Sequence, residues 1–86
     1  MERLVIHRRI IERHPEVAPE DVAFAWANRI AFGERDTDPR QICAVGFDTK
    51  GRMLEMVAAL EEDGSVLVFH AMTPPSKKTL REIELI

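Results

Sequence analysis

The sequence has one cysteine, no tyrosine and only four glycines, and it has no long apolar run. A lone cysteine cannot form a disulfide within the chain, so we expect Cys43 to be a small, buried, apolar side chain. A membrane span needs about 20 consecutive apolar residues, and Arg8 and Arg9 interrupt the first apolar stretch. These absences predict a cytoplasmic protein that has no membrane contact and needs no disulfide.

Motifs for metals and for phosphate loops are also missing. The chain has no cysteine–histidine cluster, no HExxH, no GxSxG and no glycine-rich phosphate loop. Its acidic residues lack the spacing typical of metal ligands. We therefore expect neither a metal nor another cofactor.

Charge is unevenly distributed along the 86 residues, which we predict to form a single domain over 1–86. The net charge of −3 argues against general affinity for nucleic acids. Basic side chains nevertheless gather near both ends, as Arg3, Arg8, Arg9, Arg13, Lys77, Lys78 and Arg81. If the two ends meet, they form a local basic patch; otherwise each is an ordinary solvated surface.

The most informative stretch is residues 41–72, where three apolar runs alternate with two polar turns. The turns are Asp48-Thr49-Lys50-Gly51 and Glu61-Glu62-Asp63-Gly64. Apolar runs separated by turns that end in glycine are typical of an antiparallel meander. We therefore predict strands over about 41–48, 53–60 and 65–72.

Helices are predicted on both sides of this meander. Helical spacing of apolar residues predicts a first helix over about 6–14, with residues 1–5 as a frayed end or as its start. A stripe of Val22, Trp26 and Ile30 predicts a core-facing second helix over about 19–32. A third helix over about 76–85 completes an α+β fold of two N-terminal helices, a three-stranded antiparallel meander and a short C-terminal helix.

Strand pairing predicts which side chains share a face of the sheet. We expect one face to be apolar and buried under helices, and it comprises Cys43, Val45, Phe47, Leu54, Met56, Ala58, Leu60, Leu67, Phe69 and Ala71. On the other face, Glu55 and His70 lie within cross-strand reach, beside open space above Gly46. A carboxylate orients an adjacent imidazole, which can then act as a general acid or base. The alternative is an ordinary surface pair.

Two groups of cations are candidates for binding an anion. Arg9 and Arg13 lie one helical turn apart, although solubility and ion pairing also explain them. Lys77 and Lys78 fall in the first turn of the last predicted helix, where the helix dipole disfavours cations. A bound phosphate would explain these lysines, but exposed lysines cost little there, so both interpretations stay open.

Two segments resemble the BrnT-like branch of the RelE/ParE toxin superfamily. IHRRIIERHPEVAPEDVAFAWANRI is similar to the opening helices of these small toxins, and VGFDTKGRMLEMVAALEEDGSVLVFHAM is similar to their sheet. The last strand departs from the family pattern by ending in His70-Ala71-Met72. The resemblance implies the toxin component of a type II toxin–antitoxin system, a metal-independent endoribonuclease neutralised by a partner antitoxin.

The resemblance also implies residue roles. Metal-free cleavage of RNA needs a base for the 2′-hydroxyl, an acid for the leaving oxygen and cations for the phosphate. His70 or Glu55 would supply the base or acid, and Arg52 would stabilise the phosphate, so the predicted catalytic residues are Arg52, Glu55 and His70. The predicted substrate-binding residues are Lys77, Lys78, Arg81, Arg9 and Arg13.

Two other functions stay open. A non-enzymatic interaction module would bind a partner protein through the face or edge of the sheet, and the overall acidity favours this alternative. A small-molecule enzyme or sensor would use the apolar end of the face that carries His70. A homo-oligomer also stays open, as does the choice of sheet face that the C-terminal helix covers.

Overall fold

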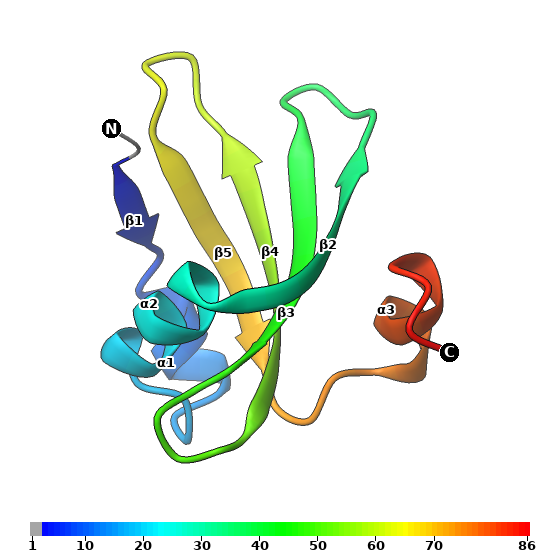
Figure 1. The fold of residues 1–86 in the computed structure, drawn as a ribbon. Coiled ribbons are helices and arrows are strands. Elements are labelled where there is room, and N and C mark those ends of the chain that lie inside the picture. The colour runs from blue at the N-terminus through cyan, green and yellow to red at the C-terminus, as the bar shows by residue number, and fades with distance from the viewer. Residues whose placement is uncertain (1–2) are drawn as a thin grey trace.

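A computed structural model describes residues 3–86 as a five-stranded mixed sheet with three short helices (Figure 1). In chain order the elements are β1 (Leu4–Ile6), α1 (Arg9–Arg13), α2 (Pro19–Ala27), β2 (Arg29–Arg35), β3 (Gln41–Phe47), β4 (Met53–Leu60), β5 (Val66–Met72) and α3 (Lys77–Glu82). Across the sheet the order is β1-β5-β4-β3-β2, with β1 parallel to β5 and the other neighbours antiparallel. Among the described residues, no helix has the length and apolar character that a membrane crossing requires.

The predicted fold class is therefore wrong, because the sheet has a further strand on each edge. Leu4–Ile6, expected as a frayed end or helix start, pairs with Val66, Leu67 and Val68 of β5. Met1 and Glu2 lie outside the described residues. Three residues are too few to show a period in the sequence, so the parallel partner on β5 determines this strand.

The second missing strand is β2, which occupies residues assigned by sequence to the end of a helix. Helix α2 stops at Ala27, and Asn28 caps it. From Arg29 to Arg35 the side chains alternate between partly buried and exposed, as in an edge strand. The stripe that suggested a longer helix ends in Ile30, which is 57% exposed, beside an irregularity in the β2–β3 pairing.

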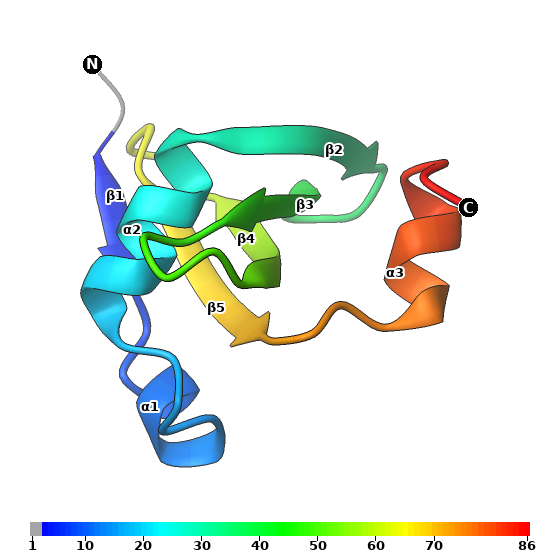
Figure 2. The ribbon, with the colours of Figure 1, turned by 60° about the horizontal axis from the view of Figure 1, so that its bottom comes forward.

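Each face of the sheet buries its own apolar cluster, because α1 and α2 lie on one side of the sheet and α3 lies on the other (Figure 2). The helices α1 and α2 cover the first face with Ile10, Val22, Ala25 and Trp26 against Ala44, Leu54, Met56, Ala58, Val66, Val68 and Ala71. On the second face, Leu80 and Ile83 of the α3 segment pack with Cys43, Val45, Val57 and Phe69. The C-terminal helix therefore covers the face that carries Glu55 and His70.

Predicted face assignments for β3 were wrong because of the loop that follows it. The Asp48 carboxylate accepts the backbone N–H groups of Lys50 and Arg52 at 2.9 Å each. This loop makes Phe47 pair with Met53 and Cys43 with Val57. Cys43 thus lies on the face of Glu55 instead of the opposite one.

A bulge in β5 causes the second error. His70 pairs with Val57 and Val68 pairs with Ala58, so Phe69 is the extra residue between them. An extra residue reverses the side-chain alternation, and Val66 and Val68 consequently join the α1/α2 cluster. The bulge lets β5 supply apolar residues to one face and His70 to the other.

Gly46 does not leave open space beside His70, contrary to the prediction. It faces α2, where a Cβ atom at this position would lie 2.3 Å from the carbonyl oxygen of Ala25. Only glycine permits so close an approach of a helix backbone to the strand. This contact fixes the distance between α2 and β3.

Candidate anion-binding site

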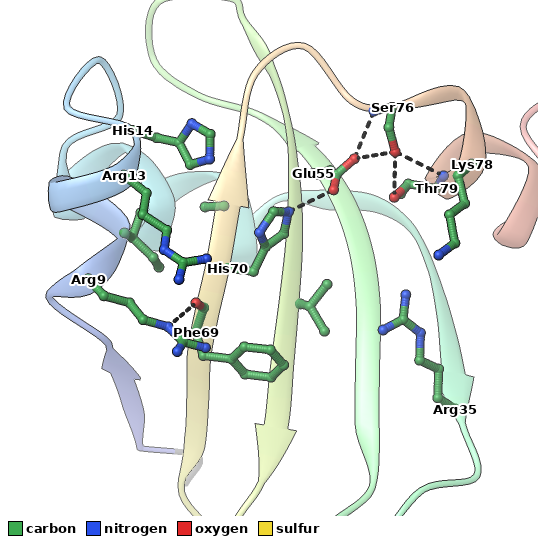
Figure 3. Close-up of a pocket in the computed structure, with 13 residues that line it drawn as sticks. Arg9, Arg13, His14, Arg35, Glu55, Phe69, His70, Ser76, Lys78 and Thr79 are labelled. Atoms are coloured by element: carbon green, nitrogen blue, oxygen red, sulfur yellow. Dashed lines mark hydrogen bonds and ion pairs between the residues drawn. The ribbon is translucent and has the colours of Figure 1, made fainter.

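A pocket of about 350 Å³ opens on the second face of the sheet, between α1, β5 and α3 (Figure 3). Its floor includes Val57, Phe69 and Ala71, and its polar lining is Arg9, Arg13, His14, Arg35, Glu55, His70, Ser76, Lys78 and Thr79. Helix α1 lies beside β5, so Ile10 both packs into the core and lines the pocket, together with its neighbours Arg9, Arg13 and His14. Four cationic side chains therefore surround a pocket that contains one carboxylate.

Glu55 and His70 are in direct contact in this pocket. His70 Nε2 lies 2.7 Å from Glu55 Oε2. The other carboxylate oxygen accepts the backbone N–H of Ser76 at 2.7 Å and the Ser76 hydroxyl at 2.9 Å. Glu55 is only 5% exposed, so these contacts hold it in one orientation.

Hydrogen bonds keep Glu55 ionised despite its burial. Burial alone would raise the pKa of its carboxyl, but bonds from the Ser76 N–H, His70, Thr79 and the Ser76 hydroxyl outweigh that effect. The net result is a pKa below the ordinary value for glutamate. Because an ionised carboxylate accepts hydrogen bonds, His70 Nε2 carries the proton, and Nδ1 of a neutral ring keeps its lone pair.

A second histidine, His14, lies beside this pair. The His14 and His70 rings meet edge to face, with their centroids 6.2 Å apart. His14 is positioned at the C-terminal end of α1, where its backbone N–H bonds to the Ile10 carbonyl oxygen at 2.7 Å. Its Nδ1 atom lies 3.6 Å from the carboxylate of Glu16.

The cations approach the pocket from two sides (Figure 3). Arg9 and Arg13 come from α1, and Arg35 and Lys78 from β2 and α3. Arg35 is held by Glu82 through contacts of 2.6 and 2.7 Å, which raises its pKa further. Within residues 3–86, the structure gives no salt bridge to Arg9, Arg13 or Lys78. Arg9 Nε donates to the Phe69 carbonyl oxygen at 3.3 Å, and its guanidinium group lies over the Phe69 ring.

Three of the predicted site residues lie elsewhere. Lys77 and Arg81 are exposed on α3 and do not line the pocket. Arg52 binds Asp48 at 2.9 Å, Asp21 at 3.2 Å and the Glu16 carbonyl oxygen at 2.9 Å. Its guanidinium group joins the β3–β4 loop to the start of α2, and it does not line the pocket.

Two buried carboxylates that Arg52 contacts, Asp21 and Asp48, belong to a larger charge network with Lys50. The Lys50 ammonium lies 2.9 Å from Asp21, whose side chain is 3% exposed. The hydrogen bond from Lys50 lowers the pKa of Asp21 against the opposing effect of burial. Burial would likewise raise the pKa of Asp48, but backbone and side-chain bonds from Arg52 lower it. The network therefore stabilises the fold and has no free charge for a ligand.

Sequence reasoning missed His14 and Arg35 as pocket residues. His14 precedes a proline and was treated as part of a connector. Arg35 fell in a segment predicted to be a loop, and its place in β2 follows from pairing with Gln41 of β3. The signal that could have placed Arg35 was the possible strand over Arg29–Arg35. Side chains alternate between the two faces of a strand, which places Arg35, Gly33 and Ala31 on one face.

Comparisons with protein-family models, with curated proteins and with solved structures found no match for this chain. The resemblance to BrnT-like toxins therefore stays a prediction. The pocket provides an oriented imidazole beside four cationic side chains, which suits a phosphate or another small anion.

Proposed function

We propose that this protein is a metal-independent endoribonuclease and the toxin component of a type II toxin–antitoxin system. The observation that carries this proposal is the buried Glu55 carboxylate, which orients His70 in a pocket lined by three arginines and Lys78. An oriented imidazole supplies a base, and adjacent cations stabilise the negative charge that develops on phosphorus oxygens during cleavage.

His70 is the base in this mechanism, and Glu55 is a positioning residue. Both oxygens of Glu55 are engaged and its pKa is lowered, so it is a poor proton acceptor. With Nε2–H donated to Glu55, His70 Nδ1 accepts the proton of a ribose 2′-hydroxyl group. Glu55 then stabilises the imidazolium ring that forms, as a carboxylate does for the histidine of a catalytic triad.

Arg9, Arg13 and Lys78 bind the scissile phosphate or its neighbours. These three side chains line the pocket from α1 and α3 and form no salt bridge within residues 3–86. Arginine forms paired hydrogen bonds with phosphate oxygens, whereas lysine acts as a point charge. Arg52, Lys77 and Arg81 have no part in this mechanism.

Purified protein incubated with RNA in EDTA tests the activity directly. We expect cleavage by the natural chain and a loss of about 10²- to 10⁴-fold in His70→Ala, the range for a general base. Arg8→Ala is the matched control, because Arg8 is exposed and outside the pocket. Equal cleavage by the natural chain and His70→Ala, or none by either, would refute the proposal.

Growth after induced expression tests the toxin assignment. We expect arrest with the natural chain and normal growth with His70→Ala at the same level of folded protein. Arrest by both forms would mean that toxicity does not depend on this pocket.

A partner-binding module is the second candidate, and an exposed edge strand favours it. On β2, Ile30 and Phe32 are 57% and 59% exposed, and the strand has a neighbour on only one side. Such an edge accepts a further strand from another chain, including an antitoxin. A Phe32→Lys variant that loses a co-purifying partner but keeps RNA cleavage would separate this role from the pocket.

A further inference from the structure

With His70 assigned as the general base, the reaction still needs a residue that acts as the general acid. Cleavage of RNA expels a 5′-oxygen, which is a poor leaving group until it gains a proton. Glu55 cannot supply this proton, because it is ionised and both of its oxygens are occupied. Among the other groups that line the pocket, arginine and lysine keep their protons, which leaves the second imidazole.

We propose that His14 is the general acid that protonates the leaving 5′-oxygen. This inference rests on the proposed ribonuclease function. The His14 ring lines the same pocket as His70 and lies 6.2 Å from it between centroids. Two groups that each lie within about 3 Å of opposite oxygens of one phosphate must themselves be several ångströms apart, and this spacing satisfies that condition.

The side chains around His14 fix which nitrogen faces the substrate. Glu16 lies 3.6 Å from Nδ1 and holds that side of the ring, which leaves Nε2 for the pocket. Arg13 and His70 line the same pocket. The Nε2–H group of the imidazolium ring is then the donor for the leaving oxygen.

The resulting reaction is a transesterification in which atoms and charges balance. His70 Nδ1 removes the proton of the 2′-hydroxyl, and the 2′-oxygen forms a bond to phosphorus. The bond between phosphorus and the 5′-oxygen breaks, and His14 transfers its proton to that oxygen. The products are a 2′,3′-cyclic phosphate and a 5′-hydroxyl end, and exchange with water restores both histidines.

A substrate with a better leaving group isolates the acid step. We suggest an RNA oligonucleotide that the natural chain cleaves, and the same oligonucleotide with sulfur in place of the bridging 5′-oxygen at the cleavage site. A thiolate departs without a proton, so it needs no general acid. We expect His14→Asn to slow cleavage of the oxygen substrate by about 10²-fold or more and that of the sulfur substrate by less than about tenfold. His70→Asn should slow both.

Several outcomes would overturn the assignment. His14→Asn could leave both substrates unaffected, or it could slow both by the same factor, as expected of a structural role. His14→Gln is the second variant, and Arg8→Ala, at the opposite end of α1, is the control. His14 has a partly exposed side chain, so both variants should fold, which circular dichroism checks.

The pH dependence of cleavage gives an independent reading. An acid and a base together give a bell-shaped profile, and loss of the acid removes the fall in rate on the alkaline side. We expect this change in His14→Asn, and an unchanged bell would contradict the role of His14. No RNA cleavage by the natural chain would instead refute the proposed function itself.

Discussion

Glu55 joins His70 to the start of helix α3 through a single buried carboxylate. One oxygen lies 2.7 Å from His70 Nε2, and the other accepts the backbone N–H of Ser76, also at 2.7 Å. Ser76 caps α3 by accepting the N–H of Thr79. The orientation of the imidazole and the position of the C-terminal helix therefore depend on the same group.

Replacement of Glu55 should affect both. We expect Glu55→Gln to reduce RNA cleavage on the order of 10²-fold, because an amide neither fixes the tautomer of His70 nor stabilises its cation. The same variant should raise the hydrogen-exchange rates of α3. Ser76→Ala keeps the N–H bond to Glu55 but loses the cap of α3, so it should also raise the exchange rates of α3 while reducing cleavage less than Glu55→Gln does. If the hydrogen-exchange rates of α3 are unchanged in Glu55→Gln, the position of α3 does not depend on Glu55.

Acid should destabilise the protein through Asp21 and Asp48. Both carboxyls have lowered pKa values in the folded state, so the folded form binds fewer protons than the unfolded form in mildly acidic solution. Their contribution is complete above the unfolded pKa of about 3.9 and is lost as the pH falls through the folded values. Urea unfolding between pH 6 and pH 2.5 should show this decline.

Asp21→Asn tests the source of that decline. We expect it to lower the free energy of unfolding at pH 7 by about 2–3 kcal/mol, since it loses charge-assisted bonds to Lys50 and Arg52, and to make stability less dependent on pH below 4. Arg52→Met should have a similar effect on stability, with normal cleavage per folded molecule. If the free energy of unfolding falls as steeply with pH in Asp21→Asn as in the natural chain, other titrating groups cause the decline.

Arg13 should contribute to RNA affinity where Arg8 does not. The two arginines lie near each other on the chain, but only Arg13 lines the pocket. In a His70→Asn background that prevents cleavage, Arg13→Ala should weaken binding of single-stranded RNA. It should also reduce the slope of log affinity against log salt by about 0.7, the value for one phosphate contact. Fluorescence anisotropy at several salt concentrations measures both quantities, and equal slopes for Arg13→Ala and Arg8→Ala would exclude that contact.

Lys77 and Lys78 offer a second such comparison. Both were predicted to bind substrate, yet Lys78 alone faces the pocket. Lys78→Ala should therefore weaken binding more than Lys77→Ala in the same assay.

Gly46 should tolerate no side chain. A Cβ atom there would lie 2.3 Å from the Ala25 carbonyl oxygen and 3.0 Å from the Arg29 Cα, and backbone atoms cannot rotate away. We expect Gly46→Ala to lower the free energy of unfolding by about 3 kcal/mol. Gly33→Ala is the control, since its nearest contact is a side-chain atom of Ile83 at 3.4 Å, and it should change stability by less than about 1 kcal/mol.

Local patterns in the sequence predicted the centre of the sheet but not its edges. Strands β3, β4 and β5 lie in the segments where apolar runs alternate with turns ending in glycine. The edges were missed because β1 has three residues and β2 begins two residues after a helix with a compatible apolar stripe. Pairing with distant residues determines both strands, and no local period encodes such pairing.

The candidate site was likewise predicted only in part from the sequence. Glu55 and His70 are brought together as expected from antiparallel strands, although through a bulge at Phe69. His14 and Arg35 could not be placed from sequence, because their positions depend on how α1 and β2 lie against β5 and β3. Arg52 was assigned to the phosphate by resemblance, but the nearby carboxylates of Asp48 and Asp21 bind it.

The parallel pairing of β1 with β5 has a consequence for synthesis of the chain. Leu4 can meet Val66 only after the last strand has left the ribosome, and the pocket needs residues from Arg9 to Thr79. Contacts so distant in sequence form late. A nascent chain therefore lacks the pocket until the residues through Thr79 have left the ribosome, whatever ligand the pocket binds.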